Sequence, residues 1–252
     1  MTEGRAIEAV GVSKSFWIPH EQRARLKEYF AHPLKRVSYE RNEALRDVTF
    51  SVGEGEFFGI VGPNGSGKST LLKVLASIYR ADAGTVRIGG RLSPFIELGV
   101  GFNPEFSART NIEINGMLMG LTRRQVAARF DAILQFAGLE RFVDQQLKNY
   151  STGMLLRLAY SVAIQVPFDI LLLDEALAVG DAEFQQKCFH TFGDMRAQGK
   201  TVVFVSHDLT VVSAFCDRAL LLERGGVAAI GEPADVIDAY RQGYEAGDVV
   251  AV

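Results

Sequence analysis

The chain has 252 residues, of which 48% are hydrophobic, and its 27 basic and 30 acidic side chains give a net charge of −3. This length predicts one large α/β domain or a domain with an inserted lobe, and the apolar content excludes a disordered chain. The near balance of charge argues against a protein built to grip nucleic acid, because such domains are usually strongly basic.

Apolar runs are short throughout the chain. Ile170–Leu173 and Val202–Val205 fall far short of the ~20 residues that a helix needs to cross a bilayer. Residues 1–10 lack the apolar core of a signal peptide. The two cysteines, Cys188 and Cys216, have no metal-type spacing and are expected to be buried in a reducing compartment. We therefore expect a cytoplasmic protein without a membrane span, which reaches a membrane only through a partner.

The first part of the chain predicts short strands and one helix. The expected strands are Ile7–Val12, Val48–Val52, Glu56–Val61, Gly84–Ile88 and Arg91–Glu97, and the expected helix is Lys68–Tyr79. The last two strands flank a Gly89-Gly90 turn. The strand that ends at Val61 runs directly into a glycine-rich loop, which the helix follows.

Residues 18–43 form an unusual segment, which is charged and lacks strand character. Within it, Arg23–Phe30 predicts a short amphipathic helix that Pro33 ends. The apolar residues at helical spacing are Leu26, Tyr29 and Phe30.

The middle of the chain is mainly helical, and a parallel-sheet pattern returns after it. The expected helices of the middle are 111–119, 123–137 and 153–165. The expected later elements are strand Phe168–Leu173, helix Ala182–Ala197, strand Thr201–Ser206, helix Leu209–Phe215, a strand pair Ala219–Glu223 and Gly226–Ile230, and helix Pro233–Tyr240. We predict one domain, whose α/β core comprises residues 1–106 and 166–252 and whose helical subdomain comprises residues 107–165.

The glycine-rich loop fits the phosphate-binding pattern G-x-x-x-x-G-K-[ST] between a strand and a helix. Its residues are Gly62, Pro63, Asn64, Gly65, Ser66, Gly67, Lys68, Ser69 and Thr70. Glycines let several backbone N–H groups converge on phosphate oxygens, and the helix adds the positive end of its dipole. Lys68 should reach the β- and γ-phosphates of ATP, and the Ser69 hydroxyl should bind Mg²⁺. The flanking strand and helix argue against the alternative, an ordinary glycine-rich turn.

Two carboxylates follow the apolar run Ile170–Leu173. A buried parallel strand delivers such groups to the edge of the sheet where ligands bind. Asp174 would hold Mg²⁺ through water, and Glu175 would be the general base that polarises the attacking water. The alternative is a buried strand that ends in solvated acids, and the phosphate loop upstream favours the functional interpretation.

Two further sites carry a weaker signal by themselves. Ser151, Thr152 and Gly153 stand just before an apolar-periodic helix, where they form either an anion site or an ordinary N-cap. His207 directly follows the strand Thr201–Ser206, so it either hydrogen-bonds a γ-phosphate or has a structural role.

The order of these motifs resembles the nucleotide-binding domain of ABC transporters over about residues 7 to 240. Gly62–Thr70 resembles the Walker A loop, Ile170–Asp174 the Walker B strand, and Glu175 the catalytic glutamate. Ser151–Gly153 resembles the signature motif. His207 resembles the switch histidine, and Asp181 resembles the D-loop aspartate. The resemblance implies a P-loop NTPase core, a mixed sheet flanked by helices, with an inserted helical subdomain and a small antiparallel β element. It also implies a homodimer that sandwiches two ATP molecules, each between one phosphate loop and the partner's signature turn.

Departures from the common motifs of ABC transporters indicate which branch of the family the sequence resembles. The signature reads Tyr-Ser-Thr-Gly-Met at 150–154. The glutamine that usually stands in the Q-loop is missing. By spacing, Glu97 is the best substitute for it, which makes Glu97 a candidate ligand of Mg²⁺. Together with Leu-Ala-Val-Gly-Asp-Ala-Glu-Phe at 177–184, these features resemble the polysaccharide-export branch, which exports O-antigen, capsular polysaccharide or teichoic acid. The resemblance also implies that adenine stacks on an aromatic at the end of the first strand. Phe16 fits that position best and Trp17 next, unless both are core residues.

The resemblance also implies partners. An integral-membrane permease, in two copies, should hold the subunit at the cytoplasmic face of the bacterial inner membrane. The apolar residues of Arg23–Phe30 should face that permease or the entrance for a lipid-linked substrate, unless the helix only covers its own domain. About twenty residues follow the start of the closing helix, so we expect no C-terminal carbohydrate-binding domain.

Overall fold

The structure, a computed structural model, describes residues 4–19, 39–95, 101–174 and 182–245. Its strands are β1 (Arg5–Pro19), β2 (Tyr39–Gly53), β3 (Phe57–Val61), β4 (Ala83–Ile88), β5 (Leu92–Phe95), β6 (Ile170–Leu173), β7 (Thr201–Val205), β8 (Arg218–Glu223) and β9 (Gly226–Gly231). Its helices are α2 (Lys68–Leu75), α3 (Ala108–Leu118), α4 (Arg123–Ala137), α5 (Thr152–Gln165), α6 (Ala182–Ala197), α7 (Leu209–Phe215) and α8 (Pro233–Glu245).

A six-stranded sheet in the order β5-β6-β7-β3-β8-β9 forms the centre of the core. All neighbours in it are parallel except β8 and β9, which form the predicted antiparallel pair. Every residue of β3, β6 and β7 is buried, as continuous apolar runs predict for parallel strands that are covered on both faces.

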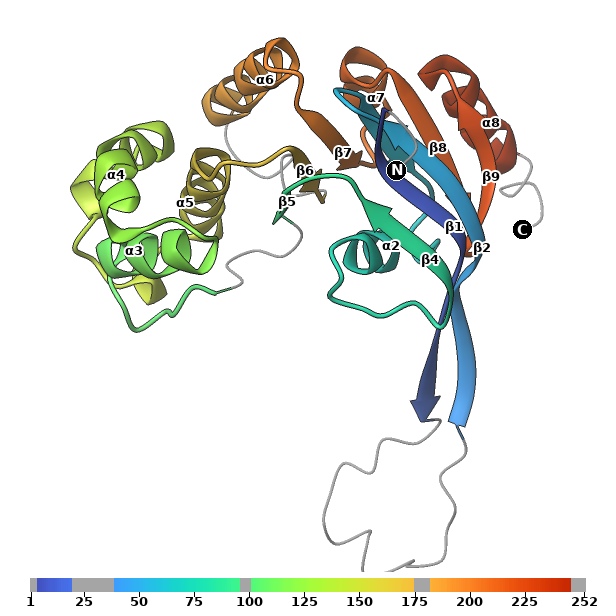
Figure 1. Ribbon diagram of the computed structural model, residues 1–252, viewed down its shortest axis with the longest axis horizontal. Coiled ribbons are helices and arrows are strands. Elements are labelled where there is room, and N and C mark those ends of the chain that lie inside the picture. Colours follow the sequence, from blue (N-terminus) through green and yellow to red (C-terminus); the bar gives the residue numbers. More distant parts are fainter. Residues whose placement is uncertain (1–3, 20–38, 96–100, 175–181, 246–252) are drawn as a thin grey trace, which may run out of the picture.

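The two faces of this sheet pack against different layers (Figure 1). On β3, Phe58 and Ile60 join a cluster with α2 and with β1 and β2. Phe57 and Val61 point to the other face, where they join a cluster with α5, α6, α7 and α8. The period of two along a strand therefore divides one strand between two hydrophobic cores.

A three-stranded antiparallel sheet, β2-β1-β4, covers one of these faces. Beyond it, β1 and β2 continue as a two-stranded ribbon, in which Trp17 pairs with Arg41 and Pro19 with Tyr39 (Figure 1). The expectation that residues 18–43 lack strand character is therefore wrong at both ends, because pairing between the two segments satisfies their backbones despite the charged sequence. The predicted helix Arg23–Phe30, with Leu26, Tyr29 and Phe30, lies outside the described residues.

The expected strand pair around Gly89-Gly90 is divided between the two sheets. β4 pairs with β1, whereas β5 pairs with β6. Asp169 accepts a hydrogen bond from the Arg91 backbone N–H at 2.9 Å, and a Cβ on Gly90 would lie 2.9 Å from the Asp169 side chain. The glycines thus let the chain cross from one sheet to the other, where the sequence suggested a turn within one sheet.

Helices α3, α4 and α5 form a helical lobe at one side of the sheets (Figure 1). They bury their own cluster, which includes Ile112, Leu134 and Leu158. The Ser107 hydroxyl accepts a hydrogen bond from Thr110 N at 3.3 Å, so α3 begins at residue 108 and not at residue 111 as expected. Within the described parts of the chain, no helix is long and apolar enough to cross a membrane.

Candidate functional site

The glycine-rich loop runs from the end of β3 to the start of α2, as the sequence predicts. At two of its positions the backbone leaves no room for a side chain. A Cβ on Gly62 would lie 2.1 Å from the Leu222 carbonyl oxygen, and one on Gly67 would lie 2.4 Å from that of Ala44. Gly67 also has a φ of +107°, which L side chains rarely adopt. The loop therefore keeps its tight path because these residues are glycines.

Lys68 is held inside the loop that it follows. Its side chain is buried, and its ammonium donates hydrogen bonds to the carbonyl oxygens of Gly62 at 2.8 Å and Pro63 at 3.0 Å. Because α2 begins at Lys68, the N-terminal end of this helix, with its backbone N–H groups, lies at the same point of the chain as the lysine. The loop thus concentrates positive potential and backbone donors at one point, which is the requirement for binding phosphate.

A pocket of about 550 Å³ opens over this loop. Its lining comprises Phe16, Asn42, Glu43, Ala44, Arg46, Asn64, Gly65, Gly67, Lys68, Ser69, Thr70, Arg224 and Gly225. The antiparallel sheet, the phosphate loop and the β8–β9 turn each supply part of the wall.

The pocket distinguishes between the two aromatic candidates. Phe16 lines it, and the Tyr79 ring holds the Phe16 ring edge-on with 5.4 Å between ring centroids. Trp17 points to the opposite face of β1, is 67% exposed and is no part of the lining. Of the two, only Phe16 therefore shares a cavity with the phosphate loop.

Two other predicted side chains follow strands that end at the same sheet edge as the loop. β7 lies between β3 and β6 and is parallel to both. Asp174 follows β6 and is half-buried, and its backbone N–H bonds to the Phe95 carbonyl at 3.1 Å. His207 follows Ser206 at the end of β7 and is exposed. Neither side chain lines the pocket, but both follow parallel strands that end at the carboxyl edge of the sheet, where the phosphate loop leaves β3.

The oxygen groups at this edge suit Mg²⁺ better than a metal that needs a full protein cage. Ser69 lines the pocket and carries a hydroxyl, and Asp174 carries a carboxylate at the same edge of the sheet. Among the described residues, no three His, Cys, Asp or Glu side chains gather to hold a metal. Mg²⁺ typically takes one or two protein ligands and completes its shell with water and phosphate oxygens, so the residues present fit it. Glu97, Glu175 and Asp181 lie outside the described residues.

The signature turn lies on the helical lobe. Ser151 is the N-cap of α5, and its hydroxyl accepts a hydrogen bond from Met154 N at 3.2 Å. None of Ser151, Thr152 and Gly153 lines the pocket over the phosphate loop. A single chain therefore does not bring the two motifs together.

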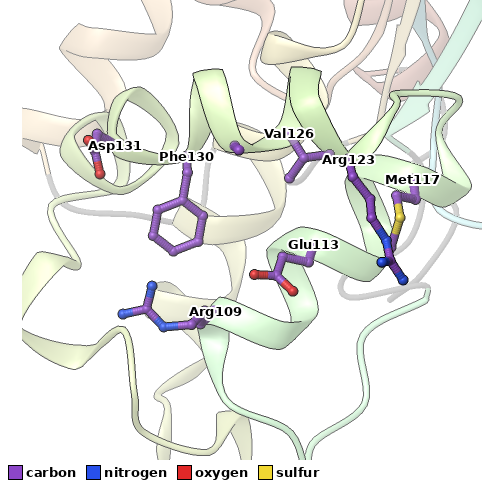
Figure 2. Close-up of a pocket in the computed structure, with 8 residues that line it drawn as sticks. Arg109, Glu113, Met117, Arg123, Val126, Phe130 and Asp131 are labelled. Atoms are coloured by element: carbon purple, nitrogen blue, oxygen red, sulfur yellow. The ribbon is translucent and has the colours of Figure 1, made fainter.

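A second pocket, of about 530 Å³, lies on the helical lobe between α3 and α4 (Figure 2). Its walls carry both signs of charge, since Arg109, Glu113, Arg123 and Asp131 line it together with Phe130. The hydrogen bond to Asp144, at 2.9 Å, raises the pKa of the Arg109 guanidinium, whose carbon lies 5.1 Å from the Phe130 ring centroid. Because Glu113 and Asp131 lie in its wall and no glycine loop does, this pocket is a poor site for a triphosphate.

Sequence reasoning missed six residues of the site: Asn42, Glu43, Ala44, Arg46, Arg224 and Gly225. Gly225 N donates to the Ser66 carbonyl at 3.0 Å, and the Gly225 carbonyl accepts from Arg46 N at 2.7 Å. The sequence marks Arg224-Gly225 as a turn, but only the long-range hydrogen bonds show that this turn lies against the phosphate loop.

The fold and the site together define a P-loop protein with the architecture of an ATP-binding cassette. The structure is similar to that of the cassette MJ0796 in a dimeric post-hydrolysis state bound to ADP and Pi, with a TM-score of 0.74. The sequences are 23% identical, over 90% of this chain and 98% of that one, so this likeness shows the fold alone.

The family model for ABC transporters matches residues 45–178, which is more than half of the chain. The chain belongs to the ABC transporter family. It is 47% identical to the ABC transporter protein AbcA of Aeromonas salmonicida, over 79% of this chain and 65% of AbcA. It is 39% identical to the O-antigen export system ATP-binding protein RfbB of Klebsiella pneumoniae, over 92% of this chain and 95% of RfbB. The chain thus spans less than two thirds of AbcA but nearly all of this RfbB.

Proposed function

We propose that this chain is the ATP-hydrolysing subunit of a transporter that exports a lipid-linked polysaccharide. The observation that carries the proposal is the pocket in which Phe16 and the phosphate loop face the same cavity, with Lys68 at its base. The likeness to RfbB, whose name assigns it to O-antigen export, supports the choice of substrate class.

Each residue of the site has a distinct role in the transfer of the γ-phosphoryl group to water. The loop Gly62–Thr70 holds the triphosphate, and Lys68 exchanges its two carbonyl partners for β- and γ-phosphate oxygens. Phe16 stacks on the adenine. Ser69 and Asp174 would hold Mg²⁺, with Glu97 as a further candidate ligand, and the ion would supply positive charge beside the phosphates.

The attacking water needs a base and the γ-phosphate needs an orienting donor. Glu175 accepts the proton of the water, and His207 hydrogen-bonds the γ-phosphate. In-line attack then breaks the bond between the γ-phosphorus and the bridging oxygen, so that ADP and phosphate leave.

A second copy completes each site. Ser151, Thr152 and Gly153 lie on the helical lobe and away from the pocket of their own chain, so we assign them to the γ-phosphate of the partner's ATP. Asp181 bridges the two copies. ATP binding thereby produces a homodimer with two nucleotides in its interface.

ATP hydrolysis by this chain would drive transport through a separate permease. We propose that two copies of an integral-membrane permease hold the dimer at the cytoplasmic face of the bacterial inner membrane, with Leu26, Tyr29 and Phe30 toward the permease or the substrate entrance. Substituting serine for these three residues should abolish export in cells and leave the ATPase rate of the isolated protein unchanged. Loss of folding in that variant would instead mean that the segment covers its own domain.

Two alternatives differ in cargo or in partner. The same site would serve an exporter of teichoic acid, lipid or drug, or, with less support, an ATPase that acts without a membrane. A permease gene beside this one, among genes for glycosyltransferases, favours polysaccharide export. Failure of the protein to co-purify with any such permease would favour the second alternative.

The test of the ATPase proposal uses two variants and a control. Glu175→Gln should bind ATP and remain as a dimer, because the water is no longer activated, whereas Lys68→Ala should bind no ATP and stay monomeric. Glu183→Gln, on the exposed surface of α6 beside Lys187, is the matched control and should behave as wild type. The measurements are phosphate release and light scattering with ATP and Mg²⁺. Undiminished hydrolysis by Glu175→Gln would overturn the assignment of the base.

A further inference from the structure

We propose that Arg224, in the turn between β8 and β9, binds the phosphates of the nucleotide and sets its affinity. The inference rests on the proposed function, because it assigns a further residue to the same ATP site. Arg224 is no part of the phosphate-loop pattern, and it reaches the pocket from a segment about 150 residues further along the chain.

Backbone hydrogen bonds hold the turn between β8 and β9 in place. Gly225 N donates to the Ser66 carbonyl at 3.0 Å, and the Gly225 carbonyl accepts from Arg46 N at 2.7 Å. These bonds tie the turn to the phosphate loop on one side and to β2 on the other. The Arg224 side chain therefore starts from a fixed point in the wall of the pocket, between the phosphate loop and β2.

The backbone of this turn has a conformation that is unusual for an arginine. The two central residues of the turn, Arg224 and Gly225, have φ values of +47° and +81°. Two-residue hairpin turns of this kind favour Asn-Gly or Asp-Gly, because a bulky residue at positive φ is strained. Residue 225 must be glycine, since a Cβ there would lie 2.9 Å from the Ala44 carbonyl oxygen. Residue 224 has no such restriction, and arginine there costs conformational energy that asparagine would avoid.

The wall of the pocket carries charges of both signs. A triphosphate is a polyanion, and in the phosphate loop itself Lys68 is the cationic residue. Arg224 and Arg46 add guanidinium groups to the wall, while Glu43 contributes an opposing charge. The Arg46 guanidinium lies 3.6 Å from a Glu43 carboxylate oxygen, which makes it the less available of the two cations.

The local ion pair does not account for Arg224. Its guanidinium lies 4.0 Å from the Glu223 carboxylate, and the arginine side chain is 88% exposed. Such exposed pairs contribute little to stability. A guanidinium bound to phosphate forms two parallel charge-assisted hydrogen bonds, which are much stronger. The chemistry of the side chain thus matches a phosphate ligand better than it matches a turn residue.

The test replaces the arginine with the residue that the turn prefers. Arg224→Asn should unfold at the same or a higher temperature than wild type, and it should bind ATP roughly tenfold more weakly. Arg224→Lys keeps the positive charge but not the planar guanidinium that forms two parallel hydrogen bonds. This variant should therefore recover part of the affinity for ATP that Arg224→Asn loses. The loss of affinity in Arg224→Asn should shrink as the salt concentration rises, because salt screens the lost attraction.

Calorimetry with the full chain separates this inference from the proposed function. One outcome would show that Arg224 is a turn residue only and that the inference is wrong. In that outcome, wild type binds ATP, Lys68→Ala does not bind it, and Arg224→Asn binds it with an affinity within twofold of wild type. An affinity loss in Arg224→Asn that does not change with salt would also overturn a phosphate contact. If wild type itself binds no ATP, the proposed function fails, and the inference fails with it.

Discussion

Replacing single glycines by alanine tests whether the phosphate loop is held by close backbone contacts. Gly67 and Gly65 belong to the same loop and both have positive φ, +107° and +79°. They differ in their surroundings. A Cβ on Gly67 would lie 2.4 Å from the Ala44 carbonyl oxygen, whereas a Cβ on Gly65 would have no atom within 4 Å. The pair therefore separates conformational strain from collision.

The expected magnitudes follow from these contacts. Gly65→Ala should lower the free energy of unfolding by about 1–2 kcal/mol, the cost of holding alanine at positive φ. Gly67→Ala carries that cost and must also move backbone atoms by several tenths of an ångström, so its loss should reach about 3–5 kcal/mol. Gly193→Ala is the opposite control. That residue is exposed in the interior of α6 with no atom near its Cβ position, and alanine there should raise the free energy of unfolding by about 0.5–1 kcal/mol.

Urea unfolding at equilibrium measures all three changes, and calorimetry at a temperature where each variant is folded measures ATP affinity. Gly67→Ala should lose ATP binding, because Gly67 adjoins Lys68 and a shifted loop no longer aims its N–H groups at the phosphates. If Gly67→Ala proves as stable as Gly65→Ala, the loop relaxes freely, and the account of a rigid phosphate cradle is wrong.

Three further results are expected. Lys68→Met should weaken ATP binding by about 100-fold or more, because charge-assisted bonds to phosphate are lost; calorimetry that finds wild-type affinity would contradict this role. Tyr160→Phe should lower the free energy of unfolding by about 1 kcal/mol, since the buried hydroxyl bonds to Thr191 at 2.8 Å, and an unchanged urea midpoint would contradict it. Burial raises the pKa of the Cys188 and Cys216 thiols to about 12, so iodoacetamide near pH 8.5 should label them only in urea. Because the thiols keep their protons to a higher pH in the folded state than in the unfolded state, the stability that they contribute should be intact below about pH 8.5 and lost as the pH rises toward 12. Rapid labelling of the native protein would contradict the raised pKa of the thiols.

The sequence predicted the parallel core well, for a clear physical reason. Continuous apolar runs such as Ile170–Leu173 have few alternatives to a buried strand, and the phosphate pattern requires a strand before it and a helix after it. The same local logic placed Asp174 and His207 at strand ends. Local patterns therefore recover what local chemistry determines.

Long-range pairing explains what the sequence left open. Nothing in the sequence shows that β4 and β5 join different sheets, because Gly89-Gly90 fits either a turn or a crossing. The choice between Phe16 and Trp17 depends on which face of β1 meets the loop, and a shift of one residue reverses it. The contact between Arg224 and the pocket needs the bond from Gly225 N to Ser66, which joins segments distant in sequence.

The same long-range bonds bear on how the site binds its nucleotide. The Ser66 and Gly225 backbones hold the loop to the hairpin, and the Lys68 ammonium is already hydrogen-bonded to the carbonyl oxygens of Gly62 and Pro63. A loop with this shape before binding loses little entropy when ATP enters, so most of the interaction energy contributes to affinity. The signature turn, on a separate lobe, has no such preorganised relation to the pocket of its own chain. Under the proposed dimeric mechanism, ATP would therefore bind first to the preorganised half-site, and the cost of joining two copies would fall on the later step that closes the dimer.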